Sequence, residues 1–158
     1  MTTFVIFEDV FSECVLTPLD NIKVDNGFEN DLCLLEGWLT HYAADLEGKK
    51  NGRNFPAVAA HSRQEGIVNQ KPAYRGDPVP AQNTRRFVLE GAVSARDPEK
   101  VNSRLESLLR DIKKALAPFR KKLTIVSVDF ILPEGSNRYA FLQVDAEIVY
   151  NEQWDIKA

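Results

Sequence analysis

The chain has 158 residues, the size of one globular domain, so we expect a single domain over 1–158. Its 44% of apolar and 27% of charged residues exclude a chain that is disordered throughout. Twenty basic and 23 acidic side chains leave a net charge of -3, which excludes nucleic-acid binding through bulk positive charge. Acidic residues follow the first apolar ones and no apolar run reaches about 20 residues, so we expect neither a secretory signal nor a membrane span.

The first segment, Phe4–Val24, predicts an interrupted helix, because its apolar residues recur every three or four positions. Pro18 breaks this pattern. Thr17 is then the expected N-cap of a second short helix, with Pro18 in its first position. Gly27 follows Asn26 and predicts the end of the helical region, because glycine adopts a positive φ without strain.

Two strands are expected next, Leu32–Tyr42 and Phe55–His61, with Pro56 restricting the second to a strand start or a sheet edge. The polar connector Gly48–Asn54 predicts a flexible hairpin loop between them. The stretch 63–83 contains three prolines and no sustained apolar period. Such long stretches are commonly functional or disordered, so we interpret it as an irregular arm that orders against a partner.

Order returns at Arg85, where alternating residues predict a strand through Val93. Asp97 is the expected N-cap of the clearest helix in the chain, with Pro98 in its first position. One apolar stripe at helical spacing supports this helix: Val101, Leu105, Leu108, Leu109, Ile112, Leu116 and Phe119.

Two strands close the chain, joined by the turn Pro133–Arg138. In the first, Thr124, Val126, Val128, Phe130 and Leu132 are expected on one face. In the second, Leu142, Val144, Ala146, Ile148 and Tyr150 form an apolar face, and Gln143, Asp145 and Glu147 form an acidic one. The apolar face is expected to pack on helices. The order α-β-β-β-α-β-β therefore predicts an α+β fold, a mainly antiparallel sheet with helices packed on one face.

Few residues suggest catalysis. Cys14 and Cys33 are expected to be reduced, buried thiols, and His41 and His61 surface or strand-end residues. We expect no catalytic residues, no cofactor and no metal, because nucleophile–base sets, zinc spacings and phosphate-binding glycine motifs are absent from the sequence. Asp129, Asp145 and Glu147 allow a metal cluster, but alternating acids on a strand are more often its solvated face.

Basic residues cluster in the loop around Lys49, before the strand at Arg85, and after the long helix at Arg120–Lys122. Because no aromatic residues alternate with them, we favour solubility and helix-end capping over nucleic-acid binding. Contacts with the acids of a neighbouring subunit are the other interpretation. Trp154 lies in a polar stretch and is expected to fold back on the core, with a role in an interface as the alternative.

Several segments, in chain order, resemble the tail terminator proteins of long-tailed bacteriophages. They are Asn26–Leu32 (NGFENDL), Phe55–Val58 (FPAV), Val88–Val93 (VLEGAV), Asp97-Pro98, Leu105–Leu116 (LESLLRDIKKAL), and Val149-Tyr150 before Trp154-Asp155. The similarity covers most of the chain, and the order and spacing of the segments carry it.

The resemblance implies a structural virion protein rather than an enzyme. Such proteins form a ring, usually hexameric, at the head-proximal end of the tail tube, where they end tube polymerisation and present a surface to the head. The implied partners are further copies of the chain, the tail tube protein and a neck or head-completion protein. DNA would pass through the lumen without sequence-specific binding, and no membrane would be involved. Assembly would take place in the host cytoplasm.

Closed rings need two different patches of one subunit to meet. The 63–83 arm and the 48–54 loop are our candidates for these patches. The candidate interface residues are Lys49, Lys50, Arg53, Arg75, Arg85, Arg86 and Trp154. The acids Asp129, Asp145 and Glu147 are placed towards the lumen or a neighbour. The nearest alternative is a tail completion or head–tail joining protein, and more distant ones are a small nucleic-acid-binding domain and a small enzyme.

Overall fold

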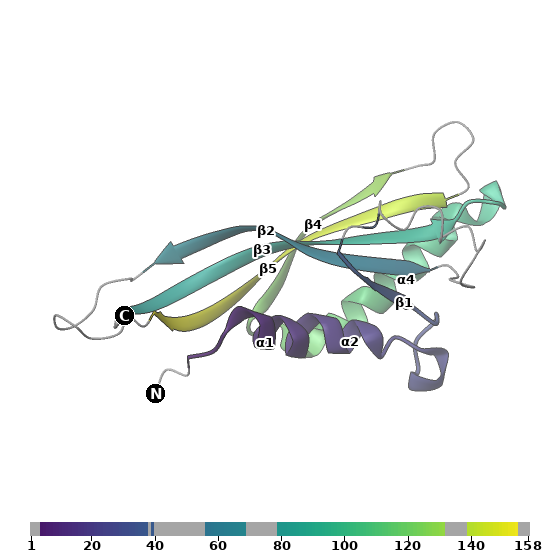
Figure 1. The fold of residues 1–158 in the computed structure, drawn as a ribbon. Helices are drawn as coiled ribbons and strands as arrows, with labels where there is room; N and C mark the ends of the chain where they lie inside the picture. The colour runs from purple at the N-terminus through teal and green to yellow at the C-terminus, as the bar shows by residue number, and fades with distance from the viewer. Residues whose placement is uncertain (1–3, 38, 40–55, 69–78, 132–138, 155–158) are drawn as a thin grey trace.

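The computed structural model describes residues 4–37, 39, 56–68, 79–131 and 139–154. They form a twisted five-stranded sheet in the order β1-β2-β3-β5-β4, with the helices on one face (Figure 1). The expected α+β fold and order of elements are confirmed. The helical elements are α1 (Phe7–Phe11), the π-helical turn η1 (Ser12–Leu16), α2 (Thr17–Asp20), η2 (Val24–Asn26), η4 (Pro98–Lys100), α4 (Val101–Leu116) and η5 (Ala117–Phe119). The strands are β1 (Cys33–Glu36), β2 (Ala57–Val68), β3 (Val79–Ser94), β4 (Leu123–Ile131) and β5 (Tyr139–Trp154).

The centre of the sheet is the antiparallel pair β3 and β5, which stay in register from Val79 opposite Trp154 to Ser94 opposite Tyr139. Strands β2 and β4 flank this pair, also antiparallel. By contrast, β1 runs parallel to β2. The expected hairpin between these two strands is therefore wrong, because a hairpin joins antiparallel strands and a parallel pair needs a crossover.

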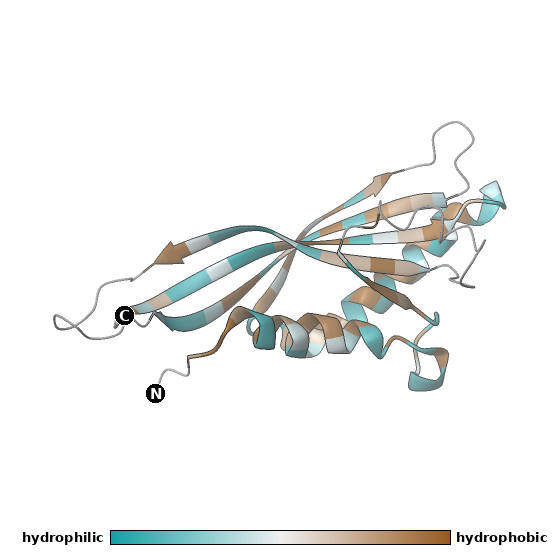
Figure 2. Ribbon diagram, in the orientation of Figure 1, coloured by the Kyte–Doolittle hydropathy of each residue, from teal (hydrophilic) through white to brown (hydrophobic). Residues whose placement is uncertain are grey.

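The main core lies between the helices and the sheet. The predicted apolar stripe of α4 is buried from Val101 to Leu116, and so is the predicted apolar face of β5. Apolar and polar residues alternate along the strands in Figure 2. Helix and sheet approach closely at Gly91, where an added Cβ would lie 2.9 Å from Leu108 Cδ2. A smaller apolar cluster lies beside β1 and consists of Leu35, Leu39, Ala57, Ala59 and Ala92.

The N-terminal helical region is one run rather than two helices. Thr17 has helical backbone angles and makes no side-chain cap bond, so its predicted role as an N-cap is wrong. The interruption is instead the π-helical turn η1, in which Thr17 N–H donates to Ser12 O. This turn precedes Pro18, which lacks the N–H that a regular helix uses. Gly27, at φ +89°, ends η2 and confirms the predicted stop.

The expected irregular arm is wrong over most of its described length. Residues 63–68 belong to β2 and residues 79–83 to β3, while 69–78 lie outside the described residues. These strands lack an apolar period because they project beyond the helices (Figure 1). Among the described residues, Pro80 has a register partner only in β5, where it lies opposite Gln153. Proline occurs in sheets at positions with a partner strand on one side only.

The interpretation of the residues around Trp154 as a polar tail is also wrong. Residues 151–154 continue β5 and pair with 79–82 of β3. Trp154 is half-buried, and its Nε1–H donates to Glu152 Oε1 at 2.8 Å. The backbone ladder holds this segment in the sheet without requiring a buried apolar face.

Some details of the strands and helices differ from the predictions made from the sequence. β1 ends at Glu36, because Gly37 turns the chain at φ +87°, whereas we expected it to reach Tyr42. A bulge at Val126 places Ile125 and Val128 on the helix side and leaves Val126 exposed, so the expected single apolar face of β4 is wrong. Asp97 takes the predicted N-cap position before Pro98, at the start of the short helix η4, but its side chain makes no cap bond.

The isolated cysteines and histidines are only partly as expected. Cys14 is buried, which raises the pKa of its thiol, whereas Cys33 is half-buried. His61 is half-buried and lies within β2 rather than at a strand end. His41 lies outside the described residues. Arg120 Nη1 donates to Ala117 O at 3.3 Å, and this confirms the expected capping after the long helix.

The turn that follows η2 is fastened to α4 by the buried carboxylate of Asp111. This carboxylate accepts the backbone N–H groups of Glu29 and Asn30 at 3.0 and 2.9 Å, and Asn30 Nδ2 at 2.8 Å. Next to it, Arg110 donates to both carboxylate oxygens of Glu29, which lowers the pKa of Glu29. Lys114 Nζ donates to Gly27 O at 2.7 Å.

Candidate assembly surface

The most polar surface of the sheet lies on the face opposite the helices. We call this surface the open face and define it by His61, Arg63, Arg86, Glu90, Asp145 and Glu147. Alternation along β5 turns Asp145 and Glu147 to this side, because the residues between them are buried under the helices. The open face therefore draws charges from three neighbouring strands.

Opposite charges pair across the open face. Arg63 Nη1 lies 3.2 Å from Asp145 Oδ1, and Arg86 Nε lies 3.8 Å from Glu147 Oε2. Ser127 Oγ donates to the other oxygen of Asp145 at 3.3 Å. The two predicted acids are thus matched by arginines and do not form a purely acidic surface. Exposed ion pairs of this kind contribute about 0–1 kcal/mol each, so a partner can replace them at little cost.

His61 and Glu90 form the remaining pair, with His61 Nδ1 3.2 Å from Glu90 Oε1. They line a shallow depression of about 520 Å³, together with Ser62, Arg63, Val88 and Gln143. A smaller depression of about 110 Å³ lies beside Arg86 and Ser127. Both are open surfaces with charges of both signs, a character that suits contact with another protein surface.

A different polar network holds the end of the sheet that projects beyond the helices. There, Arg85 Nε lies 3.0 Å from Glu65 Oε1, and the Arg85 guanidinium carbon lies 3.8 Å from the centre of the Phe7 ring. Tyr150 O–H also donates to Glu65. Burial, followed by this bond to Glu65, raises the pKa of Tyr150. Arg85 therefore fastens the projecting strands to α1, which leaves it little surface for a partner.

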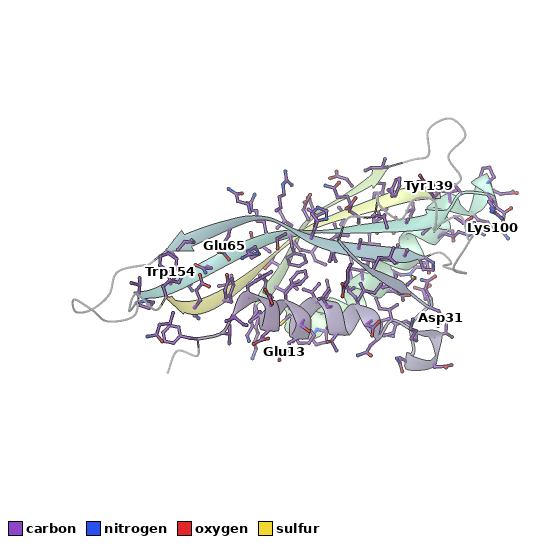
Figure 3. All side chains as sticks on the ribbon, in the orientation of Figure 1. Glu13, Asp31, Glu65, Lys100, Tyr139 and Trp154 are labelled. Atoms are coloured by element: carbon purple, nitrogen blue, oxygen red, sulfur yellow. The ribbon has the colours of Figure 1, made fainter. Side chains whose placement is uncertain are left out.

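Glu152 gathers two donors further along the same projection. Asn83 is fully buried, and its Nδ2 donates to Glu152 Oε1, the oxygen that also accepts Trp154 Nε1–H. Glu65 and Trp154 both lie on the half of the sheet away from Tyr139 in Figure 3. Trp154 thus takes part in a bonded network within the subunit.

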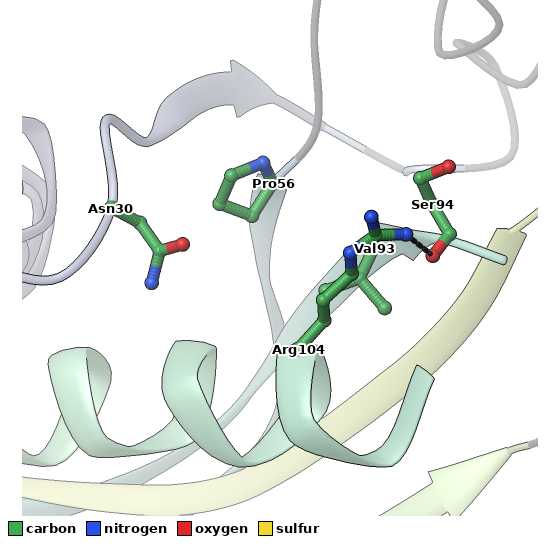
Figure 4. Close-up of a pocket in the computed structure, with 5 residues that line it drawn as sticks. All are labelled: Asn30, Pro56, Val93, Ser94 and Arg104. Carbon is green, nitrogen blue, oxygen red and sulfur yellow. Dashed lines mark hydrogen bonds between the residues drawn. The ribbon is translucent and has the colours of Figure 1, made fainter. Parts of the chain in front are cut away.

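A pocket of about 220 Å³ lies near the opposite end, between β3 and α4 (Figure 4). Arg104 is its cationic group among the described residues that line it. Arg104 Nη1 donates to Ser94 O at 3.0 Å, and Nη2 lies 3.3 Å from Asp97 Oδ2. The guanidinium is therefore used to join α4 to the end of β3.

The structure brings together four of the predicted site residues: Arg86, Asp145, Glu147 and Asp129. Asp129 lies on β4 opposite Gln143, on the same side of the sheet as the open face, and is exposed. Arg85 and Trp154 lie elsewhere, as described above. Lys49, Lys50, Arg53 and Arg75 lie outside the described residues.

Sequence reasoning missed Arg63 and Glu90 as members of this surface. Arg63 was hidden by the interpretation of its segment as an irregular arm. The available signal was the sign of the charges: Arg63 is complementary to Asp145 of the acidic face of β5, and Glu90 alternates with the apolar residues of its own strand.

Within the described residues, no cluster of three or more His, Cys, Asp or Glu side chains is arranged to hold a metal ion. Their helices are all too short or too polar to cross a bilayer. No protein-family model and no curated protein matches the chain. The features that bear on function are therefore the fold, the open face and the residue segments described above.

Proposed function

We propose that this protein is a phage tail terminator. In this proposal, copies of the chain form a ring of six, as in the family it resembles, on the head-proximal end of the tail tube. The ring ends tube polymerisation and presents the surface to which the head attaches. DNA passes through its lumen without sequence-specific contacts, and the protein belongs to the virion rather than acting as an enzyme.

The observation that carries the proposal is the one-sided sheet. Helices cover one face, while the other carries exposed arginines that pair with half-buried acids over three strands. A subunit that must contact neighbours and a tube needs such a surface, because ring contacts join two different patches of one chain. Weak ion pairs within the subunit support this role, since they can be exchanged for pairs across a contact.

The resemblance to tail terminators adds a second line of support. Two of the segments that carry it, Asn26–Leu32 and Leu105–Leu116, are bonded to each other through Asp111 and Arg110. Their residue types thus have a shared structural reason, and they define one subunit architecture. The open face is separate from this contact.

The decisive experiment is negative-stain microscopy of particles from a phage that lacks this gene. We expect overlong tubes without heads, and we expect a plasmid copy of the gene to restore normal tails. Tubes of normal length that fail to join heads would instead assign the protein to tail completion or head–tail joining. Unchanged infectious particles would reject both structural roles.

Complementation with point variants tests the surface itself. We expect Glu147→Lys to restore fewer normal tails than the wild-type gene, because it places a lysine beside Arg86 on the open face. Glu13→Lys is the matched control, because Glu13 is an exposed acid on the helical side of the molecule (Figure 3). Equal complementation by both variants would contradict a role for the open face.

A further inference from the structure

Among the strand edges without a partner strand in the described part of the chain, two can be matched to each other, one on β4 and one on β2. β4 is the last strand of the sheet, so its outer edge has no partner strand there. At the other side, β1 covers β2 only along Ala57–Ala60. Further along β2, Ser62–Val68 has β3 on one side and no described strand on the other. We call these two stretches the β4 edge and the free β2 edge.

Both edges have features that favour pairing with another strand. Proteins usually protect exposed edges with lysine, proline or short strands. β4 has nine residues and contains neither lysine nor proline. Large apolar side chains are exposed on it, with Val126, Phe130 and Ile131 at 54%, 46% and 45% of full exposure. On the free β2 edge, Ile67 and Val68 are exposed at 38% and 52%.

We infer that the β4 edge of one subunit pairs with the free β2 edge of a second copy of this chain. The inference rests on the proposed ring and names the contact that builds it. Strand polarity supports it: β4 and β2 each run antiparallel to a central strand, and those central strands are antiparallel to each other. A neighbour with its helices on the same side therefore presents its β2 antiparallel to β4.

Length and charge select one register. Placing Asp129 opposite the neighbour's Arg63 sets Thr124–Ile131 against His61–Val68, which fills the free edge from the end of β1 to the last described residue of β2. Both side chains of this pair lie on the side of the open face. Arg63 is 63% exposed despite its contact with Asp145, so a second carboxylate can reach it.

The same register pairs apolar residues. Ile125 faces the neighbour's Ile67, and both lie on the helix side of the sheet. Each strand also carries one bulge, at Arg63 in β2 and at Val126 in β4. With one extra residue on each strand, the sides that face the helices match at both ends of the paired segment, whereas between the two bulges Val128 and Ser127 face the opposite sides from the neighbour's Gln64 and Glu65.

The contact is heterologous and therefore builds rings or filaments rather than two-fold dimers. Within one subunit, Asp129 is level with Ala59, through Gln143 and Glu90. Pairing Asp129 with Arg63 thus shifts each subunit by about 10 Å along the strands. A stagger of this kind accompanies strands that tilt around a closed barrel or ring.

Disulfide trapping tests this contact directly. The variant Arg63→Cys/Asp129→Cys carries both partners on one chain, in a Cys33→Ser background that leaves only the buried Cys14. Within a subunit the two positions are separated by three strand spacings, about 14 Å, so they cannot bridge. Every disulfide between them is therefore intermolecular. After mild oxidation of purified protein and of complemented particles, we expect a ladder of covalent oligomers whose last band gives the ring size.

Single variants separate the possible geometries. A mixture of Arg63→Cys and Asp129→Cys chains should give dimers only, whereas either chain alone should give none. Asp129→Cys chains that bridge to each other would show a two-fold β4–β4 contact and overturn the inference. The double variant Lys113→Cys/Asp129→Cys is the matched control, since Lys113 is an exposed residue of α4. A ladder of equal intensity from this control would show random collision and also overturn it.

Failure of the inference and failure of the proposed function give different results. A ladder together with normal tails in the gene-deletion phage would keep the contact and reject the terminator role. Overlong tubes without any ladder, from variants with native circular dichroism, would keep the terminator role and reject the contact. Absence of a ladder in both purified protein and particles overturns the inference in either case.

Discussion

Replacing Asp111 with alanine should destabilise the protein strongly, because this carboxylate joins the turn after η2 to α4. Asp111 is 2% exposed and accepts three hydrogen bonds, two from backbone N–H groups and one from Asn30 Nδ2. Losing bonds to a charged acceptor in a partly buried site costs about 1 kcal/mol or slightly more each, or about 3–4 kcal/mol in total. That is a large part of the 5–15 kcal/mol typical of a domain.

Urea unfolding followed by circular dichroism measures this loss. With a slope of about 2 kcal/mol/M, the midpoint of the Asp111→Ala variant should fall by about 1.5–2 M without a change in slope. The control is Asp25→Ala, an exposed acid of η2, which should change the free energy of unfolding by less than about 0.5 kcal/mol. A double-mutant cycle with Asn30→Ala should give a coupling of about 1 kcal/mol or more. Equal midpoints for the Asp111 and Asp25 variants would refute the reasoning.

Three further predictions follow from single contacts. Arg110 lowers the pKa of Glu29 below its usual 4.5, so the Arg110–Glu29 pair stabilises the folded state above pH 4.5. This stabilisation is lost as the pH falls through the pKa of Glu29 in the folded state. Glu29→Gln should therefore flatten the decline of the Tm below pH 4.5. Because the pKa of Tyr150 is raised, its contribution to the stability of the fold is complete below pH 10.0 and is lost as the pH rises. An absorbance titration should show one tyrosine that ionises late, and Tyr150→Phe should remove that signal. Gly91→Val should cost about 1–3 kcal/mol in thermal or urea unfolding, because its side chain would enter the space of Leu108, whereas a similar Tm for variant and wild type would contradict this close approach.

The elements that bury one of their faces in the core could be predicted from the sequence. The stripe of α4 and the alternation of β5 were read correctly because the core imposes a period of 3.6 on a helix and of 2 on a strand. The order of elements then led to the fold class. In these segments each side chain has one burial state along the whole element, so periodicity contains the needed information.

The ends of β2, β3 and β5 could not be predicted in the same way. Where they project beyond the helices, a polar residue such as Asn83 takes a buried position of β3, and polar residues such as Asn151 and Gln82 fit the ladder as well as apolar ones. Prolines then dominated the interpretation of residues 63–83. The parallel pairing of β1 was also inaccessible, because a four-residue strand carries no signal of its direction.

The open face was predicted in part, for a related reason. The acids of β5 were found because alternation separates them from buried neighbours, whereas their arginine partners come from other strands and depend on register. Register is a long-range property, set here by two bulges, at Arg63 and Val126. A single sequence does not show which residue of a strand is the extra one.

These bulges also bear on how an exposed edge can remain selective. A flat, regular edge accepts almost any strand and leads to aggregation. A bulge bends and twists its strand, so the best partner is one with a compensating bulge at the right distance. In the proposed contact, the free β2 edge provides that bulge together with the arginine that faces Asp129. The two irregularities would therefore restrict pairing to copies of the same chain.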